Sequence, residues 1–170
     1  MKILRFLLGV AGVFLAVCVF AFLVAVFTLP ASQSFENEVE IAAAAEKVWE
    51  VVADKKRFTE WQTQLEKIEV IDGRNWVEYP KGSPEPLKFS LAGDERPAKM
   101  EFRYTMGDSF SGHWKGEISP AADGVRLKTT DSYAARDWLT KIFIYAFFDM
   151  DSFANDWNSK LKQRVESLNN

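Results

Sequence analysis

The sequence has very few of the side chains that bind metals or form cross-links. It contains one cysteine and one histidine in 170 residues. A zinc site of the usual kind needs several Cys or His ligands, so we expect no metal centre. A single cysteine cannot form a disulfide within the chain, so the fold has to be held by its apolar core. The sequence also lacks a Gly-rich phosphate loop, and we expect it to bind no cofactor.

Positive charge is scarce as well. The chain has 21 Lys and Arg residues against 24 Asp and Glu. Lys2 and Arg5 precede a long apolar run, and the rest of the chain has 19 basic and 24 acidic residues, a net charge of −5. Nucleic acid requires a basic face on its partner, so we expect this protein not to bind it.

Charge is absent altogether from Phe6 to Leu29. A helix over these 24 positions would be about 36 Å long, enough to cross a hydrocarbon layer of about 30 Å. We therefore predict a transmembrane anchor over residues 1–30. Lys2 and Arg5 place the N-terminus in the cytoplasm, and the following domain on the periplasmic or cell-surface side of a bacterial inner membrane.

Two other interpretations of this segment stay open. A cleaved signal peptide has a shorter apolar region, of about 7–15 residues, and the exit Leu29-Pro30-Ala31 is a poor cleavage site. A lipoprotein signal is suggested by Leu15-Ala16-Val17-Cys18, but apolar residues continue long after Cys18. We favour the uncleaved anchor over cleavage or lipidation.

Residues 31–170 have the size of one domain. Alternation over residues 35–41 predicts a strand with one dry face, and residues 43–54 and 55–65 predict two short helices. Six short strands should follow between residues 67 and 133, with a hairpin turn at Asp72-Gly73.

The C-terminal segment, residues 137–168, repeats apolar side chains at spacings of three and four and should be helical. An unbroken helix would be about 48 Å long, more than the width of such a domain, roughly 35–40 Å. We therefore expect a bend or break near Asp149 to Ser152.

One stretch, AAAAEKVWEVVADKKRFTEW at residues 42–61, resembles the opening of the START-like (SRPBCC) superfamily, specifically its polyketide cyclase/dehydrase and lipid-transport group. Phe110-Ser-Gly-His-Trp114 and the ending Leu161 to Glu166 are also similar. The resemblance implies an α+β helix-grip fold: a β-α-α-β6-α curved antiparallel sheet wrapped on a long C-terminal helix, here preceded by one transmembrane helix. It carries no shared catalytic motif.

The resemblance also implies a cavity between the sheet and the long helix that holds a hydrophobic small molecule or lipid. Gly112 and Gly116 lack side-chain volume on the predicted inner face, which allows such a pocket unless Trp114 and Phe110 fill it. The candidate cavity residues are Tyr104, Trp114, Asp131, Phe143, Phe147 and Trp157.

Two polar residues are candidates for chemistry, and a third, the single histidine, is not. Strand parity places Asp131 on the concave side, where it could anchor a ligand headgroup or act as a base, unless it lies solvated at the strand end. Tyr104 also points inward by parity and could orient a ligand, or pack as an ordinary core tyrosine. The single histidine, His113, should point outward and take no part in catalysis.

The stretch Trp138 to Phe148 is apolar on more than one face and needs a second partner. We expect Trp138, Ile144, Tyr145 and Phe148 to contact the bilayer surface or another protein at the mouth of the cavity. The alternative is that the loop at residues 80–86 covers this stretch.

Taken together, these features predict a membrane-anchored domain that binds or transports a lipid, isoprenoid or polyketide-like molecule without catalysis, with membrane lipid as a partner. Two alternatives remain. One is a cyclase or dehydratase that uses Asp131 and Tyr104, and the other is a protein-interaction domain with a filled core.

Overall fold

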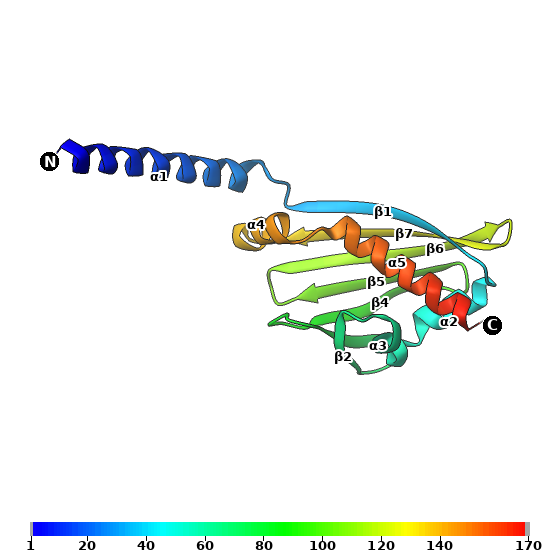
Figure 1. The fold of residues 1–170 in the computed structure, drawn as a ribbon. Helices are drawn as coiled ribbons and strands as arrows, with labels where there is room; N and C mark the ends of the chain where they lie inside the picture. Colours follow the sequence, from blue (N-terminus) through cyan, green and yellow to red (C-terminus); the bar gives the residue numbers. More distant parts are fainter. Residues whose placement is uncertain (1, 169–170) are drawn as a thin grey trace.

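The computed structural model describes residues 2–168. Residue 1 and residues 169–170, the outer ends of the predicted segments 1–30 and 31–170, lie outside the described residues. Helix α1 (Lys2–Thr28) projects away from the rest of the chain (Figure 1). Its segment Arg5–Thr28 is long and apolar enough to cross a membrane, and none of its apolar stretch is buried in the protein.

Seven antiparallel strands form one sheet in the order β1-β7-β6-β5-β4-β3-β2. The strands are β1 (Ser32–Ile41), β2 (Leu65–Val70), β3 (Asn75–Pro80), β4 (Leu87–Glu95), β5 (Lys99–Met106), β6 (Phe110–Ala121) and β7 (Gly124–Ala135). Strands β2 to β7 form a meander, and β1 extends it at one edge by pairing with β7 from Ser32↔Ala134 to Ile41↔Val125. This sheet and the helices below confirm the predicted α+β helix-grip class.

The first connection holds α2 (Ala45–Ala53), a 3-10 turn (Lys55–Arg57) and α3 (Phe58–Trp61). Helix α2 forms because its buried valines fall on one side. The predicted second helix is shorter than expected. Its last residue, Leu65, is instead the buried first residue of β2.

The C-terminal segment is two helices, α4 (Trp138–Phe147) and α5 (Met150–Ser167). The predicted break therefore lies at Phe148 and Asp149. Each helix has its own N-cap: Asp137 accepts a hydrogen bond from the Thr140 amide (2.8 Å), and Asp149 accepts one from the Ser152 amide (3.0 Å). The second cap starts a new helix in a new direction.

Helix α5 crosses the concave face of the sheet (Figure 1), and the core lies between them. Ile41, Val48, Leu127, Leu161 and Val165 join β1, α2, β7 and α5, and each is at most 1% exposed. The space beneath α5 is therefore filled by aliphatic side chains from four elements. The other helix of this segment, α4, lies beside the end of α1 and against β7.

Candidate functional site

The interior beneath α5 is closely packed. A void of about 10 Å³ lies among Val48, Trp49, Val52, Met100, Trp114, Gly116, Ile118 and Leu127. That is room for about one water molecule. The large cavity expected between the sheet and the C-terminal helix is therefore not under α5.

Gly112 and Gly116, which were expected to leave space on the concave face, do not leave it empty. A Cβ atom added at Gly112 would lie 2.1 Å from Cζ of Tyr104, and one at Gly116 would lie 2.4 Å from Cη2 of Trp114. The rings of Tyr104 and Trp114 occupy the volume that the glycines leave. Trp114 also meets Trp157 of α5 edge to face, with ring centroids 5.3 Å apart. These two tryptophans pack the core instead of lining a hollow.

A cavity of about 270 Å³ lies elsewhere, beneath α4 and its junction with α5. Its volume is just below the usual range of small-molecule pockets, about 300–1,000 Å³. The lining residues come from β1, β7, α4 and the start of α5. They are Gln33, Phe35, Tyr133, Ile144, Tyr145, Phe148, Asp149, Met150 and Asp151.

Three polar side chains form a chain of hydrogen bonds along this cavity. The Tyr133 hydroxyl donates to Oε1 of Gln33 at 2.8 Å, and Nε2 of Gln33 donates to the Tyr145 hydroxyl. The rest of the wall is largely apolar, with two carboxylates, Asp149 and Asp151, at the junction of the helices. Such a pocket suits an apolar body with a polar end.

Gln33 and Tyr133 were not among the predicted site residues. The signal for Gln33 was present, because the alternation of β1 extends back from Phe35 to Gln33 on the same face. Tyr133 follows Asp131 at the inward parity of β7, where it is 5% exposed.

Two of the predicted polar residues are in direct contact. The Tyr104 hydroxyl donates to Oδ1 of Asp131 at 2.7 Å. Asp131 lies inside β7 on the concave side, not solvated at a strand end. Burial raises the pKa of its carboxyl to about 6, although the Tyr104 hydrogen bond opposes that rise. Burial and the neighbouring Asp131 charge raise the pKa of Tyr104 well above its ordinary value.

This pair is connected to the cavity by a row of aromatic rings. Tyr104 and Phe110 have ring centroids 5.9 Å apart, Phe110 and Tyr133 5.7 Å, and Tyr133 and Phe35 6.0 Å. Asp131 also pairs with Phe35 across β7 and β1. The buried carboxyl therefore lies next to the cavity wall without being part of it.

Helix α4 has its faces reversed relative to the prediction. Phe143 and Phe147, expected in the cavity, are 51% and 74% exposed. Ile144, expected at the outer surface, is 6% exposed and packs with Tyr133 and Ala135. The predicted inward position of Phe143 and Phe147, and the predicted outward position of Ile144, were therefore wrong.

The remaining candidates on this segment divide between the two sides. Trp138 is 50% exposed and Phe148 is 55% exposed, as a surface role requires. Phe148 also lines the cavity, and so does the partly buried Tyr145. The exposure of Phe147 means that the loop at residues 80–86 does not cover this helix.

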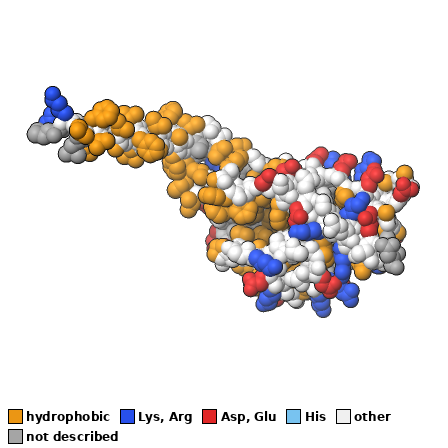
Figure 2. Space-filling model, in the orientation of Figure 1, with side chains coloured by type: hydrophobic (Ala, Val, Ile, Leu, Met, Phe, Trp, Pro, Cys, Tyr) orange, Lys and Arg blue, Asp and Glu red, His pale blue; other side chains and the backbone are white. Residues whose placement is uncertain are grey.

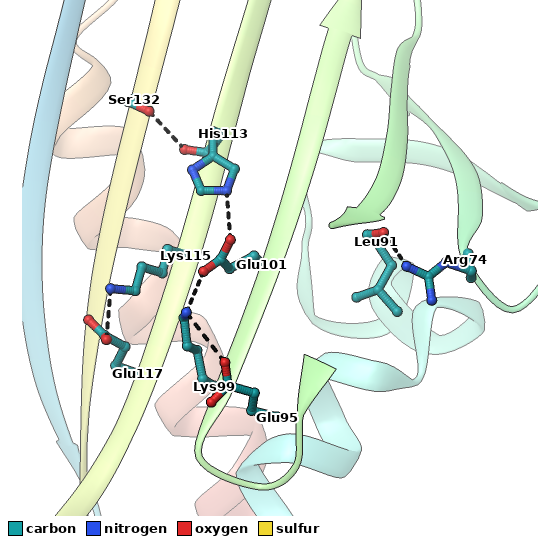
Figure 3. A network of polar contacts seen from close by, with 9 residues as sticks. All are labelled: Arg74, Leu91, Glu95, Lys99, Glu101, His113, Lys115, Glu117 and Ser132. Carbon is teal, nitrogen blue, oxygen red and sulfur yellow. Dashed lines mark hydrogen bonds and ion pairs between the residues drawn. The ribbon is translucent and has the colours of Figure 1, made fainter. Parts of the chain in front are cut away.

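His113 lies on the convex face of the sheet, as parity predicts. Its Nε2 is 3.2 Å from Oε2 of Glu101, whose Oε1 pairs with Nζ of Lys99 at 2.7 Å (Figure 3). These hydrogen bonds and ion pairs hold the Glu101 carboxyl at a pKa below its ordinary value. The histidine belongs to a surface ion-pair network on the far side of the sheet from the cavity.

Another buried charge lies over β3 and β5. Nζ of Lys55 lies 4.0 Å from the ring centre of Phe102 and 4.6 Å from that of Trp76. Burial lowers the pKa of Lys55 and raises the pKa of the neighbouring Glu78, which accepts a hydrogen bond from Nε1 of Trp76 at 2.9 Å. None of these groups lines the cavity. Among residues 2–168, no group of three His, Cys, Asp or Glu side chains could hold a metal ion.

Comparison with known proteins identifies the family to which this fold belongs. A sequence model of the family described as polyketide cyclase / dehydrase and lipid transport matches residues 32–168. A search of curated proteins finds no match. The matched segment begins at the first residue of β1 and ends just after α5, so it includes the whole sheet and both walls of the cavity.

Solved structures share the fold at low identity. A START superfamily protein from Mycobacterium smegmatis has a TM-score of 0.61 at 16% identity, covering 79% of this chain and 98% of that one. Norcoclaurine synthase from Thalictrum flavum has a TM-score of 0.61 at 16% identity, covering 79% and 86%. The Zhui aromatase/cyclase from Streptomyces sp. R1128 has a TM-score of 0.63 at 17% identity, covering 79% and 94%. At these identities the likeness shows the fold alone.

Proposed function

The chain belongs to the polyketide cyclase/dehydrase and lipid-transport family, and from that premise we propose that it binds a hydrophobic ligand beside a membrane without catalysis. The ligand class is a lipid, an isoprenoid or a polyketide-like molecule. The observation that carries the proposal is the cavity beneath α4, with its apolar wall and its Gln33–Tyr133–Tyr145 hydrogen bonds.

The lining supports a ligand that is mostly apolar. Phe35, Ile144, Phe148 and Met150 supply an apolar surface, and a hydrocarbon body placed there leaves water. The amide of Gln33 lies between two tyrosine hydroxyls and can exchange one of these hydrogen bonds for a bond to a ligand headgroup. Carboxyl groups at one end disfavour an anionic headgroup there, because like charges repel.

The N-terminal helix supports a location at the membrane. The 24 residues Arg5–Thr28 can span the hydrocarbon layer, and they end directly before β1, which forms one wall of the cavity. We propose that α1 is an uncleaved anchor with the N-terminus in the cytoplasm and the domain, residues 31–170, outside. A cavity tethered in this way stays within a few residues of the lipid that could fill it.

Native mass spectrometry of the full chain, released from its membrane in a mild detergent, tests the binding. We expect one hydrophobic small molecule to remain bound per chain. Met150→Trp adds ring volume to the cavity wall and should remove most of that molecule. Ile71→Trp, at a side chain that is 64% exposed and outside the cavity, should retain it.

Two results would count against binding. A wild-type chain that carries no small molecule would favour the protein-interaction alternative, for which the closely packed core beneath α5 provides the support. A bound molecule that Met150→Trp does not affect would place the ligand somewhere other than this cavity.

A second candidate function, an enzyme of the cyclase or dehydratase class, is favoured by the Tyr104–Asp131 pair. A carboxyl whose pKa is raised to about 6 can take up and release a proton near neutral pH, which general acid–base catalysis requires. If this function holds, Asp131→Asn would abolish conversion of the bound molecule while leaving its binding intact. Conversion that persists in this variant would exclude Asp131 as the acid or base.

A further inference from the structure

Helix α4 presents an apolar face to its surroundings and its polar side chains to the protein. The outward stripe consists of Trp138, Leu139, Ile142, Phe143, Ala146 and Phe147, which recur at the three-to-four spacing of one helix side. Thr140 and Lys141 lie on the opposite side with Ile144 and Tyr145. This order is the reverse of a surface helix in water, whose charged side faces out.

The only charge on α4 is used to hold the helix against α1. Nζ of Lys141 donates to the backbone carbonyl of Leu29 at 3.1 Å and also to that of Val26. These carbonyls are at the C-terminal end of α1, where the last oxygens lack helical partners and carry partial negative charge. The outward face of α4 therefore has no charged group, and the helix is fixed to the end of the membrane span.

The contact between α1 and α4 also fixes the depth of α4. The rings of Phe22 and Trp138 meet edge to face, with centroids 5.3 Å apart. Phe22 precedes Thr28, the last residue of α1, by six positions, which is about 9 Å along the helix axis. Interfacial helices bury their apolar face about 5–10 Å into the boundary of headgroups and acyl chains. If Thr28 lies at the edge of the hydrocarbon layer, as the proposed span requires, Trp138 lies within this depth.

Charge is distributed in agreement with this depth. Figure 2 shows hydrophobic side chains running from α1 onto the adjoining end of the domain, while acidic and basic side chains gather over the opposite part. A contiguous exposed apolar face on a domain surface indicates a contact with a membrane, a protein or a ligand, and its continuity with α1 favours the membrane.

We propose that α4 is an interfacial helix whose outward stripe is inserted in the bilayer leaflet around the C-terminal end of α1, with the exposed side chains of Trp138, Leu139, Phe143 and Phe147 in contact with lipid. The inference rests on the membrane tether of the proposed function and is independent of what the cavity binds. The inner face of the same helix supplies Ile144 and Tyr145 to the cavity wall. One helix therefore separates the cavity from the leaflet, which gives a lipid a short path between them.

Site-specific fluorescence in the full chain tests the proposal. The protein is placed in phosphatidylcholine nanodiscs, and single cysteines in a Cys18→Ser background are labelled with an NBD fluorophore. The test position is Phe147→Cys, where the side chain is 74% exposed, and the matched position is Ile71→Cys, where it is 64% exposed. The unaltered Cys18, inside α1, reports on the span itself.

The expected result is a label at position 147 that lipids with a doxyl group near the headgroup quench by about twofold or more, and that aqueous iodide barely reaches. The label at position 71 should give the opposite response, and the label at Cys18 should be quenched by lipids that carry the doxyl group deep in the acyl chain, because Cys18 lies about 15 Å from the end of α1. A label at position 147 that responds like the one at position 71 would overturn the proposal while leaving the anchor intact.

Protection of position 147 from both quenchers would also overturn it, because a second copy or another protein would then cover the face. If lipids with the doxyl group deep in the acyl chain fail to quench the label at Cys18, α1 does not span the bilayer and both the tether and the interfacial helix are excluded. Ligand binding, which is measured separately, can fail or hold in any of these cases.

Discussion

The buried carboxyl of Asp131 shows what a single side chain does to the pH dependence of stability. Its pKa rises from 3.8 to about 6 because it is buried, so the folded state holds this proton more tightly than the unfolded state does. The contribution of this group to the free energy of unfolding is fully present below pH 3.8 and is lost as the pH rises through 6.

Asp131→Asn removes this pH-dependent loss of stability, because an asparagine side chain does not ionise. We expect the variant and the wild type to have similar free energies of unfolding near pH 4, and the variant to become the more stable as the pH rises to 7. A shift of about two pKa units sets an upper limit of about 3 kcal/mol for the difference. Urea unfolding in detergent solution at several pH values measures it. A constant difference across this range would show that the carboxyl is not buried in the folded chain.

The glycine at position 112 makes a second prediction at the residue scale. An alanine there would place Cβ 2.1 Å from Cζ of Tyr104, so the ring would have to move and its hydrogen bond to Asp131 would weaken. We expect Gly112→Ala to lower the free energy of unfolding by about 1–3 kcal/mol. Gly73→Ala, with no atom within 4 Å of the added Cβ, is the matched control and should change little.

Unfolding by urea with tryptophan fluorescence gives both values. Equal effects at positions 112 and 73 would mean that the Tyr104 ring does not lie over Gly112. Strand parity alone predicted that Tyr104 and Asp131 share the concave face, because side chains alternate strictly along a strand. It did not predict their hydrogen bond, since that depends on how β5, β6 and β7 pair and curve.

At the scale of the element, α4 shows where a pattern fails. A helix in which nearly every residue is apolar has no distinct dry face, so hydrophobic spacing does not fix its orientation. The orientation follows from the less apolar positions. The Thr140 hydroxyl donates a hydrogen bond to the N-cap Asp137, and Nζ of Lys141 donates one to the Leu29 carbonyl at the end of α1. The break before α5 was predictable, because helix length exceeded domain width and polar residues stood at that point.

The contact between Lys141 and α1 can be tested as an element-scale prediction. Lys141→Met keeps most of the side-chain length but removes the charged donor from Val26 and Leu29. We expect hydrogen exchange of the α4 amides to become about tenfold faster, which is the effect of losing a charged hydrogen bond of roughly 1.5 kcal/mol. Mass spectrometry of the full chain in nanodiscs measures the rate.

Lys56→Met is the control for this variant, because Lys56 is exposed and belongs to the segment between α2 and α3. It should leave exchange in α4 unchanged. If Lys141→Met also leaves it unchanged, α4 is held by β7 alone and the hydrogen bonds to α1 contribute nothing.

For the whole molecule, order of elements and a few motif residues were enough to predict the helix-grip fold, but not the place of the cavity. The residues that identify the fold, such as Val48, Trp49 and Trp61, are buried supports of the scaffold. The place of the cavity depends on whether large rings fill the volume beside small residues. Trp114 and Tyr104 do so under α5, and the split into two helices leaves room under α4. Such volumes are a property of packing in three dimensions, which periodicity does not contain.

The distribution of charge along the whole chain predicts its topology in the membrane. Both basic residues near the span, Lys2 and Arg5, lie on its N-terminal side, and Glu36, Glu38 and Glu40 follow it before any Lys or Arg. Basic residues are retained on the cytoplasmic side during insertion, so we expect the domain to be outside. In bacterial spheroplasts, added protease should then degrade the domain of the wild-type chain.

The matched variant reverses the charges on the two sides of the span. It combines Lys2→Glu and Arg5→Glu with Glu36→Lys and Glu38→Lys. Because the basic residues now follow the span, a substantial fraction of chains should insert with the domain inside and resist the protease until the membrane is dissolved. Glu36 and Glu38 lie on the exposed side of β1 and form ion pairs with Lys128 and Arg126 of β7. Their replacement by lysine removes these surface ion pairs at a small cost in stability and leaves the buried face of β1 unchanged. A wild-type domain that is protected in spheroplasts would reverse the proposed topology and place the cavity beside the cytoplasmic leaflet.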